Sequence, residues 1–316
     1  MLRLITPCRP CKKEQLEASL DLLGVYVGDR YSVGIEIVGP WNDYFDPKII
    51  EQTKKNLQGL PKSVFLSLHA PFDIKKGSKR NFFSSEQGFQ NFLKVVKLAD
   101  EIGANLVNFH SSLLLSYKDL KKMQKAGDEN VKIYKTRSIM KVKRALEDVQ
   151  FIAGNGASRK LCLENVYYVL SGDSILNPEK MIYETTFVEP EDFLRVINPA
   201  ANIFATIDVC HLSMVYDSSQ LLAKIKKLGK GLGHIHLSDS GGIWQPFVSP
   251  AKEGAVLGEG RIGEKVFKEL LCYFLEYSKK QDLGLVLEIN DKEFVRRENL
   301  RESFKRLINW LKESDG

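Results

Sequence analysis

The amino-acid sequence predicts an α/β fold, a single-domain (β/α)₈ TIM barrel that extends over residues 1–316. Two observations predict it: short apolar runs alternate eight times with amphipathic stretches, and no linker divides the chain into halves. Nearly continuous apolar runs are typical of parallel strands covered on both faces. Strand followed by helix, eight times over, indicates a closed barrel. The alternative, an open doubly wound sheet, needs a glycine-rich turn after the first strand, where residues 7–10 read Pro-Cys-Arg-Pro.

The predicted strands are short and rich in Val, Ile and Leu. They are residues 2–7, 33–38, 64–69, 106–110, 161–166, 203–209, 233–237 and 285–289. The amphipathic stretches between them predict helices at residues 12–23, 46–57, 85–103, 131–154, 189–197, 218–228, 263–280 and 298–312. Terminal signals support two of these helices: Asp46 with Pro47 predicts a start, and Gly103 predicts an end.

The longer irregular stretches each follow a predicted strand. They are residues 39–45, 72–83, 111–130, 167–187 and 238–261. In a barrel all of them fall at the carboxyl ends of the strands, so we expect the functional site at that mouth.

Composition excludes several classes of protein. Hydrophobic residues make up 43% and charged residues 27%, which excludes general disorder. No apolar run is long enough for a membrane span, and the N-terminus does not resemble a secretory signal. The five cysteines are an odd number in a long chain, which argues against a disulfide framework and predicts a cytoplasmic location. The net charge of +6 suits a small anionic substrate and does not by itself indicate nucleic acid.

All five histidines of the chain lie in or just beyond the last residues of a predicted strand. They are His69, His110, His211, His234 and His236. A single histidine in such a place is usually a structural residue, but this concentration at one mouth indicates a site. For His234, two residues before His236, we favour a buried structural role one layer below the mouth.

Four carboxylates lie in the same predicted layer, namely Glu36, Glu164, Asp208 and Glu288. A charged group inside an apolar strand is costly unless it is paired or bound to metal. These strands carry no inward Lys or Arg, so a divalent cation is the expected partner. Several histidines with carboxylates suit zinc, manganese or iron better than calcium or magnesium.

At these residues the chain resembles the xylose isomerase-like barrel superfamily, which includes endonuclease IV, hydroxypyruvate isomerase, the ketohexose epimerases and inosose dehydratase. The motifs that carry the resemblance are His-Ala-Pro-Phe at 69–72, Val-Asn-Phe-His at 107–110, Leu-Glu-Asn at 163–165, Asp-Val-Cys-His at 208–211, His-Leu-Ser-Asp-Ser at 236–240, Leu-Gly-Glu-Gly-Arg-Ile-Gly at 257–263 and Leu-Glu at 287–288. Together they extend over nearly the whole chain.

The resemblance implies a set of metal ligands. One ion would be held by Glu164, Asp208, His236 and Glu288. A second ion, as in the endonuclease branch, would use His69 and His110, with Glu164 shared between both ions.

Two departures from the relatives' patterns affect the predicted activity. In the nuclease branch a third metal uses the histidine matching His211 and an Asp-x-His, whose two positions are here Lys252 and Gly254. This loss counts against phosphodiester cleavage, which depends on clustered metals there. Epimerases usually carry an arginine six residues after the histidine matching His236, and Gly242 stands at that position.

The favoured function is a metal-dependent isomerase or epimerase of a sugar, sugar phosphate or related polyol. Glu164 and Glu288 would act as acid and base on the two faces of the substrate, through an enediolate. His211 would assist them. Further substrate contacts are expected from Asn165, Arg261 and Lys252, and Glu36 would either touch the substrate or support a ligand. The alternatives are an endonuclease acting at abasic DNA sites, with nucleic acid as partner, and a barrel that binds sugar without turnover.

Two features leave their alternatives open. The segment 117–144 holds ten basic and three acidic residues, and it is either a solvated helix face, a lid or a nucleic-acid-facing arm. The glycines after the seventh predicted strand, at 241–242 and 258–260, either bind a phosphate through their amides or simply form turns. Cys8 and Cys11 form a C-x-x-C, which we interpret as incidental because no second such pair accompanies it.

Overall fold

The structure is a computed structural model that describes residues 1–27, 31–71, 82–111, 114–125, 127–152, 159–166, 182–184, 186–241, 253–291 and 296–315. Among these residues no helix combines the length and hydropathy needed to cross a membrane.

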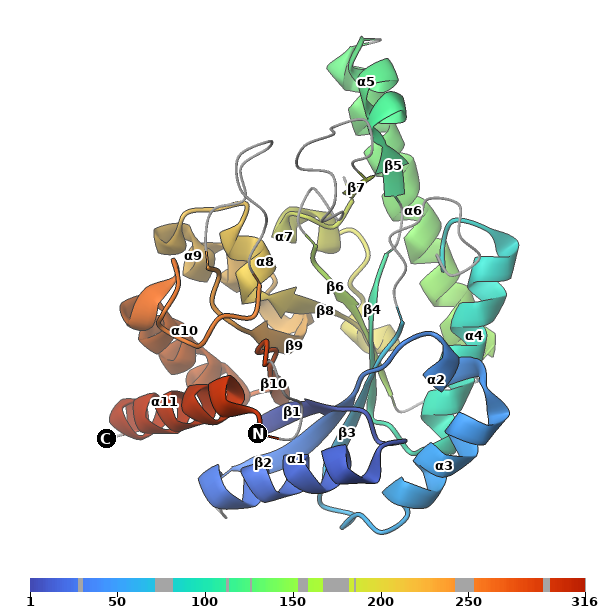
Figure 1. The fold of residues 1–316 in the computed structure, drawn as a ribbon. Coiled ribbons are helices and arrows are strands. Elements are labelled where there is room, and N and C mark those ends of the chain that lie inside the picture. Colours follow the sequence, from blue (N-terminus) through green and yellow to red (C-terminus); the bar gives the residue numbers. More distant parts are fainter. Residues whose placement is uncertain are drawn as a thin grey trace.

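Eight parallel strands close into a barrel (Figure 1), which confirms the predicted fold class. In order around the barrel they are β1 (Leu2–Cys8), β10 (Leu283–Leu287), β9 (Leu232–Leu237), β8 (Ile203–Asp208), β6 (Lys160–Glu164), β4 (Leu106–His110), β3 (Phe65–His69) and β2 (Ser32–Ile37). Each predicted strand is present, with bounds that differ by at most two residues at either end. That a single domain extends over residues 1–316 stays a prediction.

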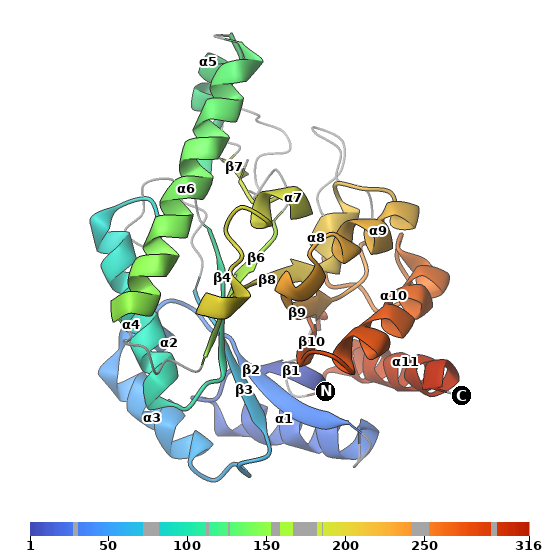
Figure 2. The same ribbon diagram turned by 180° about the vertical axis from the view of Figure 1, so that it is seen from behind.

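Most of the helices cover the outside of the barrel, as Figures 1 and 2 show from opposite sides. They are α1 (Lys13–Tyr26), α2 (Asn42–Phe45), α3 (Pro47–Leu57), α4 (Glu86–Glu101), α5 (Tyr117–Lys125), α6 (Asp128–Ile152), α7 (Pro190–Phe193), α8 (Val209–Ser213), α9 (Leu221–Lys226), α10 (Gly263–Ser278) and α11 (Glu298–Asp315). The predicted helix start at Asp46 is confirmed, since its side chain accepts a hydrogen bond from the backbone N–H of Lys48. Gly103 ends its helix region with a φ of 71°, as expected for a terminating glycine.

The stretch 111–130 contains regular structure that the sequence did not predict. Strand β5 (Leu114–Ser116) pairs antiparallel with β7 (Ile182–Glu184), and α5 follows β5 directly. Helix α5 and the beginning of α6 project beyond the carboxyl ends of the barrel strands (Figures 1 and 2). Two predicted helices are shorter than expected: 189–197 contains only α7, and 218–228 consists of a 3₁₀ turn (Ser218–Gln220) followed by α9.

Aromatic packing fixes the strand that carries His110. Phe109 points away from the barrel interior, and its ring lies 4.8 Å from that of Phe92 on α4, centroid to centroid. Phe83 completes the group, 5.1 Å from Phe92. All three side chains are buried. Because successive side chains of a strand point to opposite faces, this packing turns Asn108 and His110 toward the barrel interior.

Candidate metal and active site

The mouth of the barrel brings together the side chains that the sequence singled out. Ligand atoms of Glu164, Asp208, His236 and Glu288 all lie within 4.8 Å of one another. Those of His69, His110 and Glu164 form a second group by the same measure. Glu164 belongs to both groups, so the two overlapping sets predicted from the resemblance are adjacent in space.

Glu164 lies at the centre of these contacts. Its Oε2 is 3.1 Å from Nε2 of His69 and 3.2 Å from Nε2 of His110. Its Oε1 is 3.4 Å from Nδ1 of His236. Asn108 donates to Oε2 through its side-chain amide at 2.5 Å. With 1% of its side chain exposed, Glu164 depends on these neighbours to compensate for lost hydration.

Strand register explains why these residues meet. His110 is paired directly with Glu164 across β4 and β6, and Asp208 with His236 across β8 and β9. Each pair lies at the carboxyl end of its strands. Residues level with one another on neighbouring strands of a closed barrel point into it together, which produces a layer of convergent side chains.

Asp208 is held by the start of the next helix. The strand β8 ends at Asp208, and α8 begins at the following residue. Oδ1 of Asp208 accepts from the backbone N–H of His211 at 2.8 Å, which caps α8. Its other oxygen, Oδ2, is 3.7 Å from Nδ1 of His211.

One buried nitrogen tests whether this group suits a metal ion. Among the described residues, Nδ1 of His236 has no hydrogen-bond partner of acceptable geometry. Oxygen atoms of Glu288 and Glu164 nevertheless lie 3.3 and 3.4 Å from it. An imidazole nitrogen without a hydrogen bond, together with the carboxylate oxygens around it, forms the set of ligand atoms expected for a divalent cation. The residues present therefore fit a metal ion.

The electrostatics of the group also favour a bound cation. Burial raises the pKa of Glu164, but His236 and His110 outweigh burial and hold that pKa well below its ordinary value. Burial lowers the pKa of His69, yet the adjoining Glu164 raises it to about 9. Burial, together with Glu288 and Glu164, raises the pKa of Asp208 to about 7 in spite of His211. The buried carboxylates are therefore stabilised by neighbouring positive charge, which is the electrostatic environment of a cation site.

Glu288 differs from the other three members of its group. It follows β10 directly, and its side chain is 31% exposed, whereas those of Glu164, Asp208 and His236 are at most 2% exposed. Glu288 therefore lies on the open side of the group, where a substrate can reach it.

Asn165 and His211, expected to contact substrate or catalyse, hold each other in place. The side chain of Asn165 accepts from the backbone N–H of Asp208 at 2.7 Å and donates to its carbonyl at 3.1 Å. Nδ1 of His211 is 2.9 Å from the carbonyl oxygen of Asn165, which places the Nδ1 proton on that bond. Nε2 of His211 then faces Glu253, 3.6 Å away.

Arg261 is not brought to the group. Its guanidinium donates to the carbonyl of Ser213 and to Asp217, both at 2.9 Å. Lys252 lies outside the described residues, as do Gly242 and most of the stretches 72–83 and 167–187.

The glycine-rich turn after β9 wraps around a carboxylate of the chain itself. Asp239 is buried and accepts from five backbone N–H groups, at 2.8 to 3.4 Å. The donors are Ser240, Gly258, Gly260, Ile262 and Gly263. A Cβ at Gly260 would lie 2.5 Å from Oδ1 of Asp239, so glycine is required there. For the amides of residues 258–263 this favours the turn interpretation over phosphate binding.

Replacing Asp239 with alanine is expected to lower the free energy of unfolding by roughly 3 kcal/mol or more, because several buried N–H groups lose their acceptor. Urea unfolding followed by circular dichroism measures it. The matched control is Asp217→Ala, which removes an exposed ion pair with Arg261 and a capping contact with Gln220, and is expected to cost no more than about 2 kcal/mol. Equal losses in both variants would contradict this role of Asp239.

Sequence reasoning missed three residues of the site. Asn108 was noted only as part of a motif, yet it contacts Glu164 directly. Ser67 donates to Glu36 at 3.0 Å. Glu253 stands between the two positions that would serve a third metal, and it reaches His211. Alternation along the strands could have signalled Ser67 and Asn108, since each points into the barrel from a strand that carries a predicted ligand.

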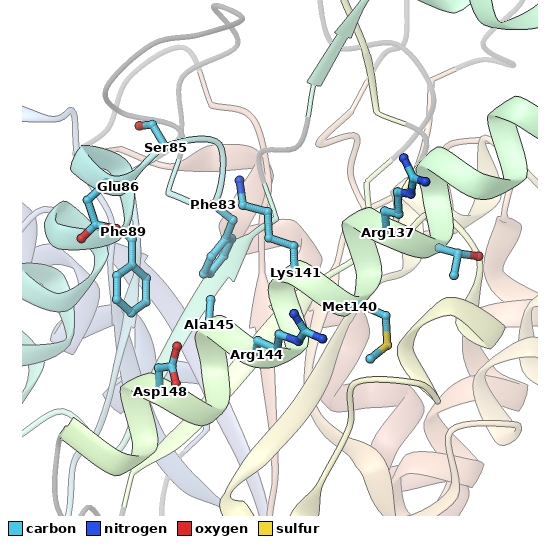
Figure 3. Close-up of a pocket in the computed structure, with 11 residues that line it drawn as sticks. Phe83, Ser85, Glu86, Phe89, Arg137, Met140, Lys141, Arg144, Ala145 and Asp148 are labelled. Carbon is cyan, nitrogen blue, oxygen red and sulfur yellow. The ribbon is translucent and has the colours of Figure 1, made fainter.

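A groove of about 610 Å³ lies on the outside of the barrel, between α4 and α6 (Figure 3). Its lining combines the rings of Phe83 and Phe89 with the α6 side chains Arg137, Lys141 and Arg144. None of the residues that line it is a histidine, so it is separate from the candidate metal site.

Comparison with known proteins identifies the family of the barrel. A family model described as a xylose isomerase-like TIM barrel matches residues 32–314. A search of curated proteins gave no significant match. Among solved structures, a D-tagatose 3-epimerase-like protein aligns over 100% of both chains, with 18% identity and a TM-score of 0.63.

Two further solved structures are similar. Endonuclease IV from Thermus thermophilus aligns over 99% of both chains, with 16% identity and a TM-score of 0.57. The IOLI protein, whose structure contains a bound zinc atom, aligns over 99% of this chain and 96% of its own, with 14% identity and a TM-score of 0.53. At these identities the likeness establishes the fold.

Proposed function

Because the chain belongs to the xylose isomerase-like TIM barrel family, we propose that it is a divalent-metal-dependent isomerase or epimerase of a sugar, sugar phosphate or related polyol. One observation carries the proposal: two glutamates from well-separated strands, Glu164 and Glu288, meet in one group with Asp208 and His236. Strands β8 and β9 lie between β6 and β10 in the barrel, so the two carboxylates approach the group from different sides.

This arrangement suits proton transfer between adjacent carbons. In an isomerisation one carboxylate takes a proton from carbon and, now protonated, returns it to the adjacent carbon. In an epimerisation the second glutamate must enter the step protonated, so that it can deliver a proton on the opposite face. Glu288, the more exposed, is the group we assign to proton abstraction, and Glu164 is its partner. Asp208 and His236 complete the ligand set. A divalent ion held there would stabilise the negative charge that develops on the substrate oxygens.

The chemistry of the donors favours zinc, manganese or iron, as one or two ions. Histidines together with carboxylates match borderline metals better than the hard cations calcium and magnesium. A structure of similar fold is in keeping with this, since that of the IOLI protein holds zinc. A small carbohydrate is the proposed partner, and a cytoplasmic location remains part of the proposal.

A second candidate is cleavage of DNA at abasic sites. The group formed by His69, His110 and Glu164 favours it, because an additional metal position beside the first is what phosphodiester hydrolysis uses. The basic segment 117–144, on α5 and α6, projects beside the mouth (Figure 1). The region of the third metal argues against this function. Lys252 and Gly254 stand where the nuclease branch has its Asp and His ligands, and Glu253 between them is the residue that reaches His211.

One paired assay separates these functions. The purified protein, loaded with manganese or zinc, is incubated with pooled sugars and sugar phosphates and, in parallel, with DNA that contains an abasic site. We expect conversion of at least one sugar and no metal-dependent nicking. Efficient nicking without sugar conversion would establish the nuclease instead. Sugar binding with neither sugar conversion nor DNA nicking would indicate a barrel that binds sugar without turnover.

A further inference from the structure

Beneath the candidate metal group lies a carboxylate that no substrate can reach. The side chains of Glu36, His234 and His236 are each 0% exposed. Oε1 of Glu36 is 3.0 Å from Nε2 of His236, and Oε2 is 2.9 Å from Nε2 of His234. Ser67 donates to the same Oε2 at 3.0 Å. Of the two roles left open by the sequence, burial favours support of a ligand over contact with substrate.

We propose that Glu36 is a positioning residue that fixes the proton of His236 on Nε2 and thereby leaves Nδ1 free of a proton for the metal. The inference rests on the proposed metal site, and it does not depend on which reaction the site performs. The 3.0 Å contact lies outside hydrogen-bond geometry, but an ionised carboxylate has only acceptor sites, so it repels a lone pair on the facing ring nitrogen and favours a proton there. The neutral imidazole carries a single N–H, which leaves the other nitrogen with a lone pair.

The direction of the ring supports this assignment. Nδ1 of His236 faces Oε1 of Glu288 and Oε1 of Glu164, which is the side of the metal group. Nε2 faces Glu36, on the opposite side of the ring. Carboxylate–histidine–metal arrangements of this kind orient the ring and raise the basicity of the ligating nitrogen.

The surroundings of Glu36 are consistent with its role. Its described ion pairs are both with histidines, and Ser67 donates to one of its oxygens. Such neighbours suit a carboxylate anion, whose oxygens are acceptors only.

Asn108 offers the one competing interaction among the described residues. Its side-chain nitrogen lies 3.3 Å from Nε2 of His236, so an unprotonated Nε2 could accept from it. That arrangement would turn a lone pair toward Glu36 at 3.0 Å, which is repulsive. The amide of Asn108 has two N–H groups, and one of them donates to Glu164 at 2.5 Å. At Nε2 the contact with Glu36 is shorter than that with Asn108 and involves a full charge, so it favours the protonated nitrogen.

His234 holds the other oxygen of Glu36 and provides a matched control. It lies opposite Gly284 in the strand register, and a Cβ at Gly284 would come within 2.6 Å of its Nδ1. The glycine thus makes room for the ring. His234→Gln keeps a donor toward Oε2 while leaving the contact between Glu36 and His236 unchanged. A general disturbance of this buried layer would affect both variants, whereas loss of the Glu36 acceptor affects only one.

The experiment uses zinc as the probe and two independent measurements. In the unchanged protein with ¹⁵N-labelled histidine, the nitrogen shifts of the zinc-loaded form report which nitrogen of each ring carries a proton and which binds zinc. We expect His236 to bind zinc through Nδ1 and to carry its proton on Nε2. Competition with a chromophoric chelator then measures zinc affinity. Glu36→Gln, which offers only one acceptor oxygen to two donor rings, is expected to weaken zinc binding roughly 10- to 100-fold, and His234→Gln to leave it close to that of the unchanged protein.

The outcomes are distinguishable. Zinc on Nε2 of His236, or equal weakening in both variants, would overturn the role of Glu36 while leaving the metal site intact. Absence of zinc binding by the unchanged protein would overturn the metal site and this inference together. A protein that binds zinc as expected but converts no sugar would leave the role of Glu36 standing and refute the proposed reaction. If Glu36→Gln does not fold, the spectrum of the unchanged protein still decides.

Discussion

Replacing Glu288 with glutamine is expected to lower turnover of the sugar substrate by at least about 100-fold, the usual scale for loss of a general base. Glutamine keeps the shape of the side chain and one oxygen that can bind a metal, but it cannot accept a proton at neutral pH. Glu288 is the exposed member of its group, and Glu164, Asp208 and His236 remain in place to hold the ion. Steady-state kinetics with the substrate found in the paired assay measures the effect.

Elemental analysis of the same preparation provides the control on metal content, which is expected to be largely retained. Glu259→Gln is the matched control for the chemical change, since Glu259 is an exposed carboxylate that pairs with Arg306. Its turnover is expected to stay near that of the unchanged protein. If Glu288→Gln turned over substrate at the normal rate with full metal content, Glu288 would not be the base.

The combined substitution Glu164→Ala with Asp208→Ala is expected to remove nearly all bound metal from protein purified without chelators. Glu164 is shared by both overlapping groups, so its loss damages each of them. Loss of a residue that merely supports a ligand costs roughly 10- to 100-fold in metal affinity, and loss of two direct ligands should cost more. Elemental analysis by mass spectrometry gives the result directly. Metal content unchanged by both substitutions would refute the ligand assignment.

His69→Ala with His110→Ala makes a separate test of the second group. It removes two of the three ligands there and leaves Glu164, Asp208, His236 and Glu288 together. We expect isomerase activity to be retained and metal content to fall by at most one ion. If the protein is instead a nuclease, the same pair of substitutions should abolish cleavage at abasic sites, because that reaction relies on clustered metals.

The barrel could be predicted from sequence because its determinants are local. A strand such as β10, buried on both faces, needs a continuous apolar run, and the run is visible in five residues. Short side chains and capping residues mark where helices begin and end, as at Asp46. The projecting helix α5 and the pairing of β5 with β7 were not visible. Three-residue strands carry too little periodic signal, and this pairing joins residues about 70 positions apart.

For the site, the sequence determined which residues converge, because histidines and carboxylates at the ends of parallel strands must meet at one mouth. It could not assign their depth or their partners. Only the tertiary structure decided that Glu36 lies below the metal group, that Asp239 occupies the amides of the glycine-rich turn, and that Arg261 turns toward Asp217. These outcomes depend on register and on side-chain direction across the closed barrel, where a shift of one residue moves a side chain to the other face.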